Sequence, residues 1–397
     1  MANWKEYKIE QFADVVGGGT PSTKEPNYYN GNIPWITPKD LTNFSQRHIS
    51  RGERSITIDG LNNSSARLIP KNSILLTSRA PIGYLAIAAN EICTNQGFKS
   101  LVINPEIADY NFIYYLIKGN IEEIKAQGSG TTFAEVSGTV VRNLKFRLPP
   151  LPTQTAIAKI LSSLDDKIEL NNQINKELEA LAQALFKHWF IDFEFPDENG
   201  QPYKSSGGEM VESELGEIPK GWKVGLIQEL LEVKYGKDHK HLHEGEIPVY
   251  GSGGIMRYAN EALYKNHSIL IPRKGTLSNL FYVSKPFWSV DTMFYSIIKE
   301  DYLKKYLYYR LKSLDLASMN VGSAVPSMTT KILNELKVIV PSKDGLIKFE
   351  AGISSFFEYQ DELKDENQNL VSLRDSLLPK LISGELEVSE VLTEKVK

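Results

Sequence analysis

Apolar residues recur at alternating steps of three and four along residues 151–195. The repeating positions are Ile157, Leu161, Leu164, Ile168, Asn171, Leu178 and Leu185. A seam this long predicts a coiled-coil helix. An asparagine at a seam position, such as Asn171, typically fixes the register of the paired helices at a cost in stability. At about 1.5 Å per residue, roughly forty residues would span on the order of 60 Å, so the seam needs a partner along its length.

A second stretch, residues 343–386, carries the same pattern. Its seam consists of Leu346, Ile353, Phe356, Leu363, Asn367, Leu370, Leu377 and Leu381. Polar residues interrupt both seams, and the two stretches are of similar length, which favours pairing between them. The alternative is that each is an unrelated amphipathic helix packed on its own domain.

Short apolar runs between turn residues precede each long helix. Residues 73–77, 84–88 and 98–103 have the composition of buried strands, whereas residues 110–118 and 302–312, rich in Tyr and Leu, predict helices. Residues 144–148 and 336–340 predict strands that end at prolines. The fold class expected is therefore α+β, with a curved sheet in each globular part.

The two halves of the chain are related by an internal repeat. Trp4 corresponds to Trp222, and Pro149 corresponds to Pro341, so the offset falls from 218 (222 minus 4) to 192 (341 minus 149). The second copy is thus shorter by about 26 residues, and the loss is expected mostly early in its globular part. Duplication followed by divergence accounts for this pattern better than chance similarity.

These features divide the chain into six segments. We expect a first globular domain at 1–150, a helix at 151–195, a polar linker at 196–220, a second globular domain at 221–342, a helix at 343–386 and an irregular tail at 387–397.

Composition and charge narrow the class of protein. The 397 residues are 41% hydrophobic, which indicates a globular protein, and the single cysteine, Cys93, excludes a disulfide framework and a cysteine-based zinc site. No apolar run is long enough for a membrane span and no signal peptide is visible, so a cytoplasmic protein is expected. The net charge of −4 divides into +3 for residues 1–150, −7 for 151–215, +5 for 216–341 and −5 for 342–397. The two globular segments are therefore the candidates for phosphate contacts.

Several catalytic motifs are missing from the sequence. No phosphate-binding loop of the Gly-x-x-x-x-Gly-Lys-Ser/Thr type occurs, and no Asp/Asn-Pro-Pro-aromatic run is present to hold a flipped adenine. His239, His241 and His243 would share one face of an extended segment, but no Cys or acidic pair nearby completes a metal site. A solvated or phosphate-facing loop is the better interpretation of this segment.

Several motifs together resemble the specificity subunits of type I restriction–modification systems. They are residues 18–22 (Gly-Gly-Thr-Pro-Ser), 33–36 (Ile-Pro-Trp-Ile), 148–171 around the double proline, 202–208 (Pro-Tyr-Lys-Ser-Ser-Gly-Gly) and 377–386 at the end of the second helix. The resemblance covers the whole chain. One departure is the segment 340–345, which lacks the proline-rich, Gln-containing opening of the first helix, so the start of the second helix is expected to be shorter or differently docked.

The resemblance implies two target-recognition domains, each reading one half of a split, asymmetric DNA sequence, and two helices that pair antiparallel as a ruler. It also implies two methyltransferase subunits, which bind S-adenosylmethionine, and restriction/translocase subunits, which use ATP and Mg²⁺. This chain itself would hold no cofactor, no metal and no catalytic residue. The alternatives are a self-sufficient restriction enzyme or methyltransferase, for which no motif is visible, and a structural coiled-coil adaptor without DNA specificity.

Polar and basic residues in loops and at strand ends are the candidates for DNA contact, since Lys and Arg hold phosphates while Arg, Asn, Gln and Thr read base edges. In the first domain they are Thr20, Lys24, Lys39, Ser78, Arg79, Gln96, Lys99, Thr131 and Thr132. In the second they are Lys240, His241, Ser252, Arg257, Arg273, Lys274, Asn279 and Lys331.

Overall fold

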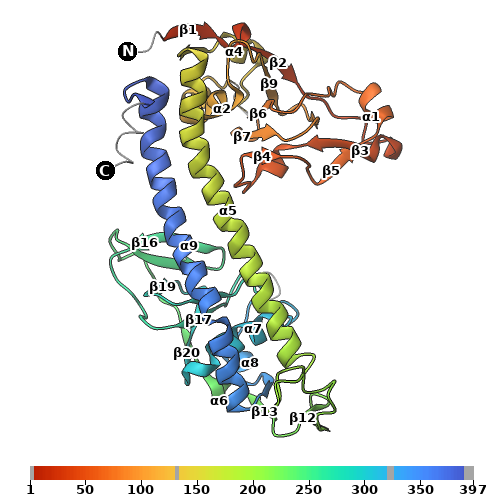
Figure 1. The fold of residues 1–397 in the computed structure, drawn as a ribbon, viewed down its shortest axis with the longest axis vertical. Helices are drawn as coiled ribbons and strands as arrows, with labels where there is room; N and C mark the ends of the chain where they lie inside the picture. The colour runs from red at the N-terminus through yellow and green to blue at the C-terminus, as the bar shows by residue number, and fades with distance from the viewer. Residues whose placement is uncertain (1–3, 130–133, 320–325, 389–397) are drawn as a thin grey trace. The chain divides into compact units, whose positions relative to one another are not determined.

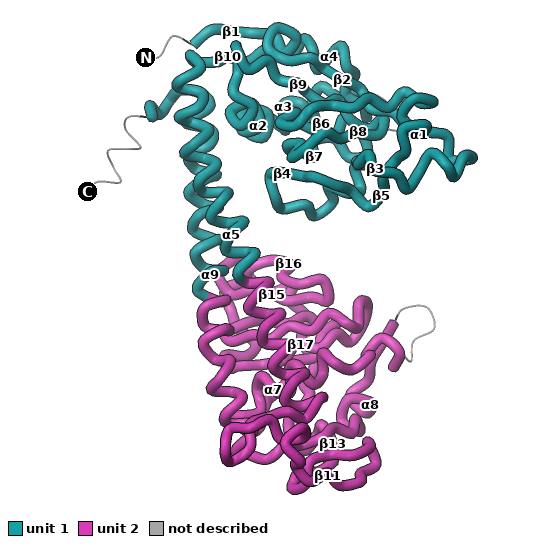
Figure 2. Tube along the Cα trace, turned by 45° about the vertical axis from the view of Figure 1, so that its right-hand side comes forward, with its two compact units in different colours: residues 1–174, 362–397 teal, residues 175–361 magenta. Residues whose placement is uncertain are grey.

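The computed structural model describes residues 4–129, 134–319 and 326–388. It consists of two compact units, shown in different colours in Figure 2. The first unit comprises residues 1–174 and 362–397, and the second comprises residues 175–361. Each unit combines a globular α+β part with segments of two long helices, as the sequence predicted (Figure 1).

The first unit contains two sheets and a strand pair. Its strands are β1 (Lys5–Lys8), β2 (Ala13–Gly17), β3 (Tyr29–Ile36), β4 (His48–Ile49), β5 (Arg54–Ile56), β6 (Ile74–Ser78), β7 (Ile82–Ala88), β8 (Cys93–Thr94), β9 (Lys99–Ile103) and β10 (Lys145–Leu148). One sheet has the order β2-β9-β6-β7-β4, the other has the order β5-β3-β8, and β1 pairs with β10. Its short helices are α1 (Ile58–Asn62), α2 (Tyr110–Gly119), α3 (Ile121–Ala126) and α4 (Gly138–Asn143).

The core of the first unit lies where α2 meets the larger sheet and the long helices. Asp109 caps α2 by accepting a hydrogen bond from the backbone N–H of Phe112, and six consecutive residues of α2, 112–117, are buried. A helix that is apolar on nearly every side must be covered on nearly every side. Leu161, Leu378 and Leu381 of the long helices belong to the same buried cluster.

The second unit repeats this arrangement. Its strands are β11 (Met210–Val211), β12 (Ile218–Pro219), β13 (Lys223–Leu226), β14 (Leu231–Tyr235), β15 (Ile247–Gly251), β16 (Gly254–Ala259), β17 (Ser268–Pro272), β18 (Phe281–Val283), β19 (Trp288–Ser289), β20 (Met293–Ile298) and β21 (Lys337–Val340). The sheets have the orders β14-β20-β17-β18 and β16-β15-β19, with β13 paired to β21 and β11 to β12. Its short helices are α6 (Ile227–Leu230), α7 (Lys304–Lys312) and α8 (Thr330–Asn334).

Strand register confirms the internal repeat. Lys5 pairs with Leu148 in the first unit and Lys223 pairs with Val340 in the second, which gives offsets of 218 (223 minus 5) and 192 (340 minus 148). The first unit has β4, β5 and α1 between β3 and β6, whereas the described segment between β15 and β17 contains only β16. The second copy is therefore shorter early in its globular part, as predicted.

The long helices are α5 (Leu151–Phe190) and α9 (Lys343–Ser383). Within the first unit, Asp165 of α5 contacts Arg374 of α9 and Asn171 contacts Asn367, so the chain direction is antiparallel. Within the second unit, the backbone carbonyl of Asn175 accepts a hydrogen bond from Gln360, again in antiparallel order. α9 has 41 residues against 40 in α5 and begins 192 residues after it (343 minus 151), so the expectation of a shorter start is wrong, while a different docking of that start stays a prediction.

All the predicted seam positions are buried or half-buried. Ile157, Leu161, Leu164, Asn171, Leu346, Ile353, Leu363 and Leu381 are buried, and Ile168, Leu178, Leu185, Phe356, Asn367, Leu370 and Leu377 are half-buried. The helix ends are covered by other elements besides the partner helix, because Phe186 and Phe190 of α5 pack on Tyr306 of α7.

Residues 196–220 fold as part of the second unit. The ring of Phe195 stacks on Tyr203 at 4.6 Å and on Trp222 at 4.9 Å. The Tyr203 hydroxyl donates to the carbonyl oxygen of Glu209, and β11 pairs with β12. Aromatic stacking therefore fixes a segment whose composition resembles that of a linker.

Candidate nucleic-acid interface

In the second unit, several predicted contact residues lie around the end of β17. Arg273 follows this strand directly, its guanidinium lies 5.3 Å from the ring centre of Tyr235, and it donates a hydrogen bond to the backbone oxygen of Asp291. Lys274 is exposed and its backbone bridges to Ser327. The Tyr235 hydroxyl lies 3.5 Å from the Thr330 hydroxyl, next to the exposed Lys331 in α8.

The turn between β15 and β16 belongs to the same neighbourhood. Asn279 donates a hydrogen bond of 2.8 Å to the backbone oxygen of Ser252 in this turn. A Cβ atom placed on Gly275 would lie 3.0 Å from the Ser252 hydroxyl. Ser252, Arg273, Lys274, Asn279 and Lys331 thus come from different segments of the chain and gather around one surface, which we call the β17 surface.

A second group lies further along the β15–β16 hairpin. Arg257 of β16 donates a hydrogen bond of 2.7 Å to the backbone oxygen of Leu242, which lies in the loop between β14 and β15. Lys240 and His241 of the same loop are exposed. The His241 ring lies 5.6 Å from Trp288. Within residues 4–129, 134–319 and 326–388, no three His, Cys, Asp or Glu side chains are placed to hold a metal ion.

In the first unit, two predicted residues meet at one carboxylate. Lys99 lies 3.1 Å from Glu135, and Arg79 lies 3.7 Å from the same side chain. The Thr20 hydroxyl donates a hydrogen bond to the exposed Gln96 side chain. Lys99 and Arg79 thus share the Glu135 carboxylate in the free chain, which leaves one net positive charge, and a bound phosphate would compete with that carboxylate.

The remaining predicted residues of the first unit fall in different settings. Lys24 is exposed, and Lys39 is exposed and paired with Glu53, whose hydrogen bond raises the lysine pKa. Ser78 ends β6 as expected, but it is only 1% exposed and its hydroxyl donates to the backbone oxygen of Gly97. The prediction that Ser78 projects toward DNA is therefore wrong for this structure, because a buried and bonded hydroxyl does not reach a duplex. Thr131 and Thr132 lie outside the described residues.

The two units place basic residues at equivalent positions. Arg79 follows β6 and its backbone bridges to Glu135, while Lys274 follows β17 two positions after the strand and bridges to Ser327. The offsets are 195 (274 minus 79) and 192 (327 minus 135), which agree with the repeat. Glu135 was not predicted from the sequence, because nothing in the chain around it signals that the strand end folds against it.

A buried polar cluster attaches the globular part of the first unit to the long helices. The Tyr115 hydroxyl donates to Asp165 at 2.6 Å, Arg374 donates to the other oxygen of Asp165 at 2.7 Å, and Lys118 lies 4.0 Å away. Burial, together with the neighbouring Asp165 charge, raises the pKa of the Tyr115 hydroxyl, so it stays protonated as a donor.

The second unit has an equivalent cluster, and its acid again lies on α5. The Tyr309 hydroxyl donates to Glu179 at 3.0 Å, and Lys312 lies 2.7 Å from the same carboxylate. Tyr309 and Lys312 of α7 occupy the positions of Tyr115 and Lys118 in α2, at an offset of 194 in both cases (309 minus 115 and 312 minus 118). Asp165 lies on the helix that follows its own domain, whereas Glu179 lies on the helix that precedes its domain. We call these two clusters the carboxylate clamps.

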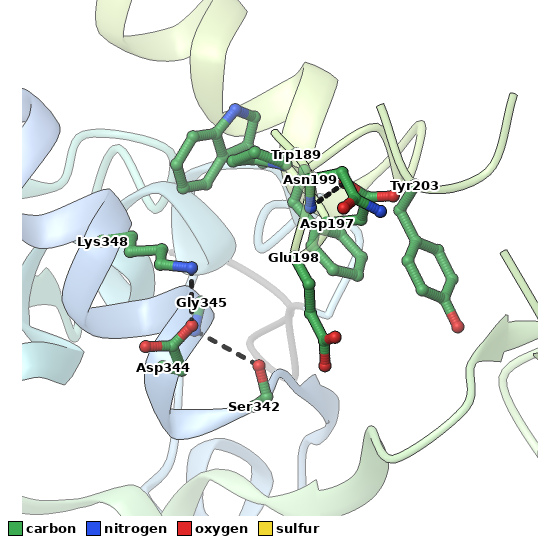
Figure 3. Close-up of a pocket in the computed structure, with 11 residues that line it drawn as sticks. Trp189, Asp197, Glu198, Asn199, Tyr203, Ser342, Asp344, Gly345 and Lys348 are labelled. Carbon is green, nitrogen blue, oxygen red and sulfur yellow. Dashed lines mark hydrogen bonds and ion pairs between the residues drawn. The ribbon is translucent and has the colours of Figure 1, made fainter. Parts of the chain in front are cut away.

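A cavity of about 400 Å³ lies in the second unit, where the end of α5 meets the start of α9 (Figure 3). Trp189, Phe195 and Tyr203 supply aromatic walls, and Asp197, Glu198, Asp344 and Lys348 supply charges. Lys348 pairs with Asp344 at 2.8 Å, and the Gly345 N–H donates to the Ser342 hydroxyl. The excess of acidic groups does not suit a phosphate, so this cavity is not part of the DNA surface.

Comparison with known proteins agrees with this architecture. A family model for the type I restriction modification DNA specificity domain matches residues 1–180 and 219–369. The type I restriction enzyme MjaIX specificity subunit of Methanocaldococcus jannaschii is 34% identical, over 98% of this chain and 95% of its own length. The HindI specificity subunit of Haemophilus influenzae is 25% identical, over 97% of this chain and all of its own length.

A solved structure shows the same fold. The type I restriction–modification S subunit from M. genitalium matches with a TM-score of 0.63 and 21% identity, over 96% of both chains. The chain therefore belongs to the family of type I restriction–modification DNA specificity subunits. It is a non-catalytic subunit that selects the DNA sequence and assembles with the other subunits of such a system, which carry the catalytic activity. None of the described helices is both long and apolar enough to cross a membrane.

Proposed function

We propose that each unit reads one half of a split, asymmetric DNA target, through surfaces centred on the ends of β6 and β17. The observation that carries this proposal is the pair of basic residues, Arg79 and Lys274, at equivalent strand ends of two repeated folds. Repeated domains on an antiparallel helix pair present themselves to DNA as the two halves of a dimer would. Because the side chains around them differ, the two half-sites would differ in sequence.

The helix pair would dock two methyltransferase subunits, which bind S-adenosylmethionine and methylate adenine at N6. Exposed apolar residues outside the seam support this proposal: Leu170 and Leu181 on α5, and Tyr359 and Leu373 on α9. Apolar positions on a helix surface that are exposed in the free chain are suited to a partner helix. Restriction/translocase subunits, which use ATP and Mg²⁺, would complete a nuclease assembly.

The test is to map N6-methyladenine in a genome, in cells that express this chain with its methyltransferase subunit and in cells that lack the chain. We expect one split motif to appear only when this chain is present. A motif that is unbroken, or methylation that does not depend on the chain, would contradict the proposal.

A structural adaptor that binds only proteins, the alternative weighed from the sequence, does not fit a chain that belongs to a family of DNA specificity subunits. The two functions differ in their response to salt. DNA contact through Arg and Lys releases counterions, so affinity for the mapped target should fall steeply as salt rises from about 50 to 200 mM. An adaptor would show no salt-sensitive DNA binding at all.

A further inference from the structure

Two adjacent apolar side chains are exposed at the tip of the β15–β16 hairpin. Ile255 is 48% exposed and Met256 is 59% exposed. Neighbouring residues of a regular strand point to opposite faces, so two consecutive exposed apolar residues need a local cause. The cause is a bulge: Tyr250 pairs with Ile255 and Val249 pairs with Arg257, which leaves Met256 without a partner on β15. A bulge of this kind redirects side chains and is frequent beside functional sites.

The tip is held in place. Asn279 donates its hydrogen bond to the carbonyl oxygen of Ser252 in the turn, which ties the hairpin to the loop after β17. A Cβ atom at Gly251 would lie only 2.4 Å from the sulfur of Met256, so only glycine leaves room for the methionine to lie where it does. The exposed pair is therefore presented by a fixed turn.

The surroundings of the pair are those of the candidate DNA surface. Ser252, in the turn, and Arg257, next after Met256, are both predicted contact residues, and Asn279 connects the turn to the β17 surface. The equivalent strand pair of the first unit, β3 and β5, differs, because Arg54 of β5 covers the rings of Tyr29 and Trp35. The exposed pair thus belongs to the unit that would read the second half-site.

We propose that Ile255 and Met256 form an apolar wedge that enters between two base pairs of the half-site read by the second unit. Proteins insert Ile, Met, Leu or Phe between base steps in this way, which partly unstacks the step and kinks the duplex. Pyrimidine–purine steps unstack most readily, so the wedge gives this half-site a preference that depends on deformability. This inference rests on the proposed function, because it needs the second unit to contact DNA.

The experiment compares three complexes of the full chain with its methyltransferase subunit. They carry the natural chain, the double variant Ile255→Ser/Met256→Ser, and the control Ile58→Ser/Leu68→Ser, which replaces two exposed apolar residues of the first unit. Each is added to target duplexes in which 2-aminopurine replaces one adenine at a time in and beside the second half-site. The fluorescence of 2-aminopurine rises when the base is unstacked, and affinity is measured on the unlabelled target.

A methyltransferase flips its target adenine out of the stack, so every complex should give a signal at the methylated adenine. Apart from that position, we expect the natural complex and the control to raise the fluorescence several-fold at one step only. The double variant should lose this signal and bind the target roughly 10-fold more weakly, since a duplex that is not kinked wraps less of the protein surface. A duplex with a mismatch at that step is already unstacked, so the variant should bind it almost as well as the natural complex does.

Three results would overturn the wedge. If the natural complex binds the split target but raises no signal at any step other than the methylated adenine, DNA recognition stands and the wedge fails. If the double variant loses affinity for the methyltransferase subunit while its unstacking signal stays intact, the hairpin tip is a protein contact. If the natural complex does not bind a split target at all, the proposed function and the wedge fail together.

Discussion

Asp165 shows how one buried side chain connects a recognition domain to the helices. Its two carboxylate oxygens accept from Tyr115 of the domain and from Arg374 of α9, and its side chain is 6% exposed. A charge in this position is tolerated because it is paired and hydrogen-bonded on both oxygens. Neutralising it removes the buried counter-charge of Arg374 and leaves that guanidinium with only the exposed Asp375.

We therefore predict that Asp165→Asn lowers the free energy of unfolding by about 3–5 kcal/mol. Asp375→Asn is the matched control, because Asp375 pairs with the same arginine at 2.7 Å but its side chain is 56% exposed. An exposed pair is worth about 0–1 kcal/mol, so the control should change stability little. Urea unfolding of the three chains gives the comparison, and equal effects from both substitutions would contradict it.

At the level of single residues, the sequence predicted seam positions well and contact residues less well. Asn171 and Leu161 were predictable because heptad spacing alone determines which residues face the partner helix. The burial of Ser78 was not predictable, because it depends on a hydrogen bond to Gly97, nineteen residues away. Glu135 was missed for the same reason, since its meeting with Lys99 and Arg79 depends on the path of the chain.

Among the elements, the helix pair depends on polar residues in an apolar seam. Asn171 donates from one amide nitrogen to Asn367 at 2.9 Å and to Glu366 at 2.8 Å, and its own amide oxygen is buried without a hydrogen-bond partner in the described residues. Burying an unsatisfied amide group costs free energy that an apolar side chain would not cost. The register of the pair, by contrast, depends on the asparagines meeting each other.

We predict that replacing Asn171 and Asn367 together by Leu raises the free energy of unfolding by roughly 1–3 kcal/mol. The single variant Asn171→Leu should instead lower it, because Asn367 then loses its buried partner. Thermal unfolding of the two variants and the natural chain would show this change of sign. Two shifts in the same direction would mean that the asparagines act independently.

Elements with a regular period were predictable, and elements fixed by scattered contacts were not. Both long helices and the strands before their prolines follow from periodicity and from proline chemistry. The packing of residues 196–220 does not, because Phe195, Tyr203 and Trp222 have no periodic spacing and meet only when the chain folds back. A polar composition therefore concealed an ordered segment.

For the whole molecule, the repeat explains the tyrosine and lysine of the two carboxylate clamps but not their acids. Tyr115 with Lys118, and Tyr309 with Lys312, were duplicated with their domains, while Asp165 and Glu179 are both on α5. Another domain of this family can keep a tyrosine and a lysine three residues apart on the helix equivalent to α2. Such a domain has the groups needed to bind Asp165 on α5. We therefore expect the clamp to accept such a domain without a change in Asp165.

We predict that replacing residues 1–150 by the corresponding domain of another specificity subunit changes only one half of the methylated motif, provided that the incoming domain supplies this tyrosine and lysine. The other half depends on the second unit, whose core and clamp are formed by residues 175–361 and stay untouched. Mapping N6-methyladenine in cells expressing the chimaera reads both halves at once.

The matched control is the same chimaera with its tyrosine changed to Phe and its lysine to Met, which leaves Asp165 paired only with Arg374. We expect that control to lose methylation of the new half-site, since the domain would no longer be held at a fixed angle to the helices. If the control methylates as well as the parent chimaera, the other contacts between the domain and the helices position it and the clamp has no part in recognition.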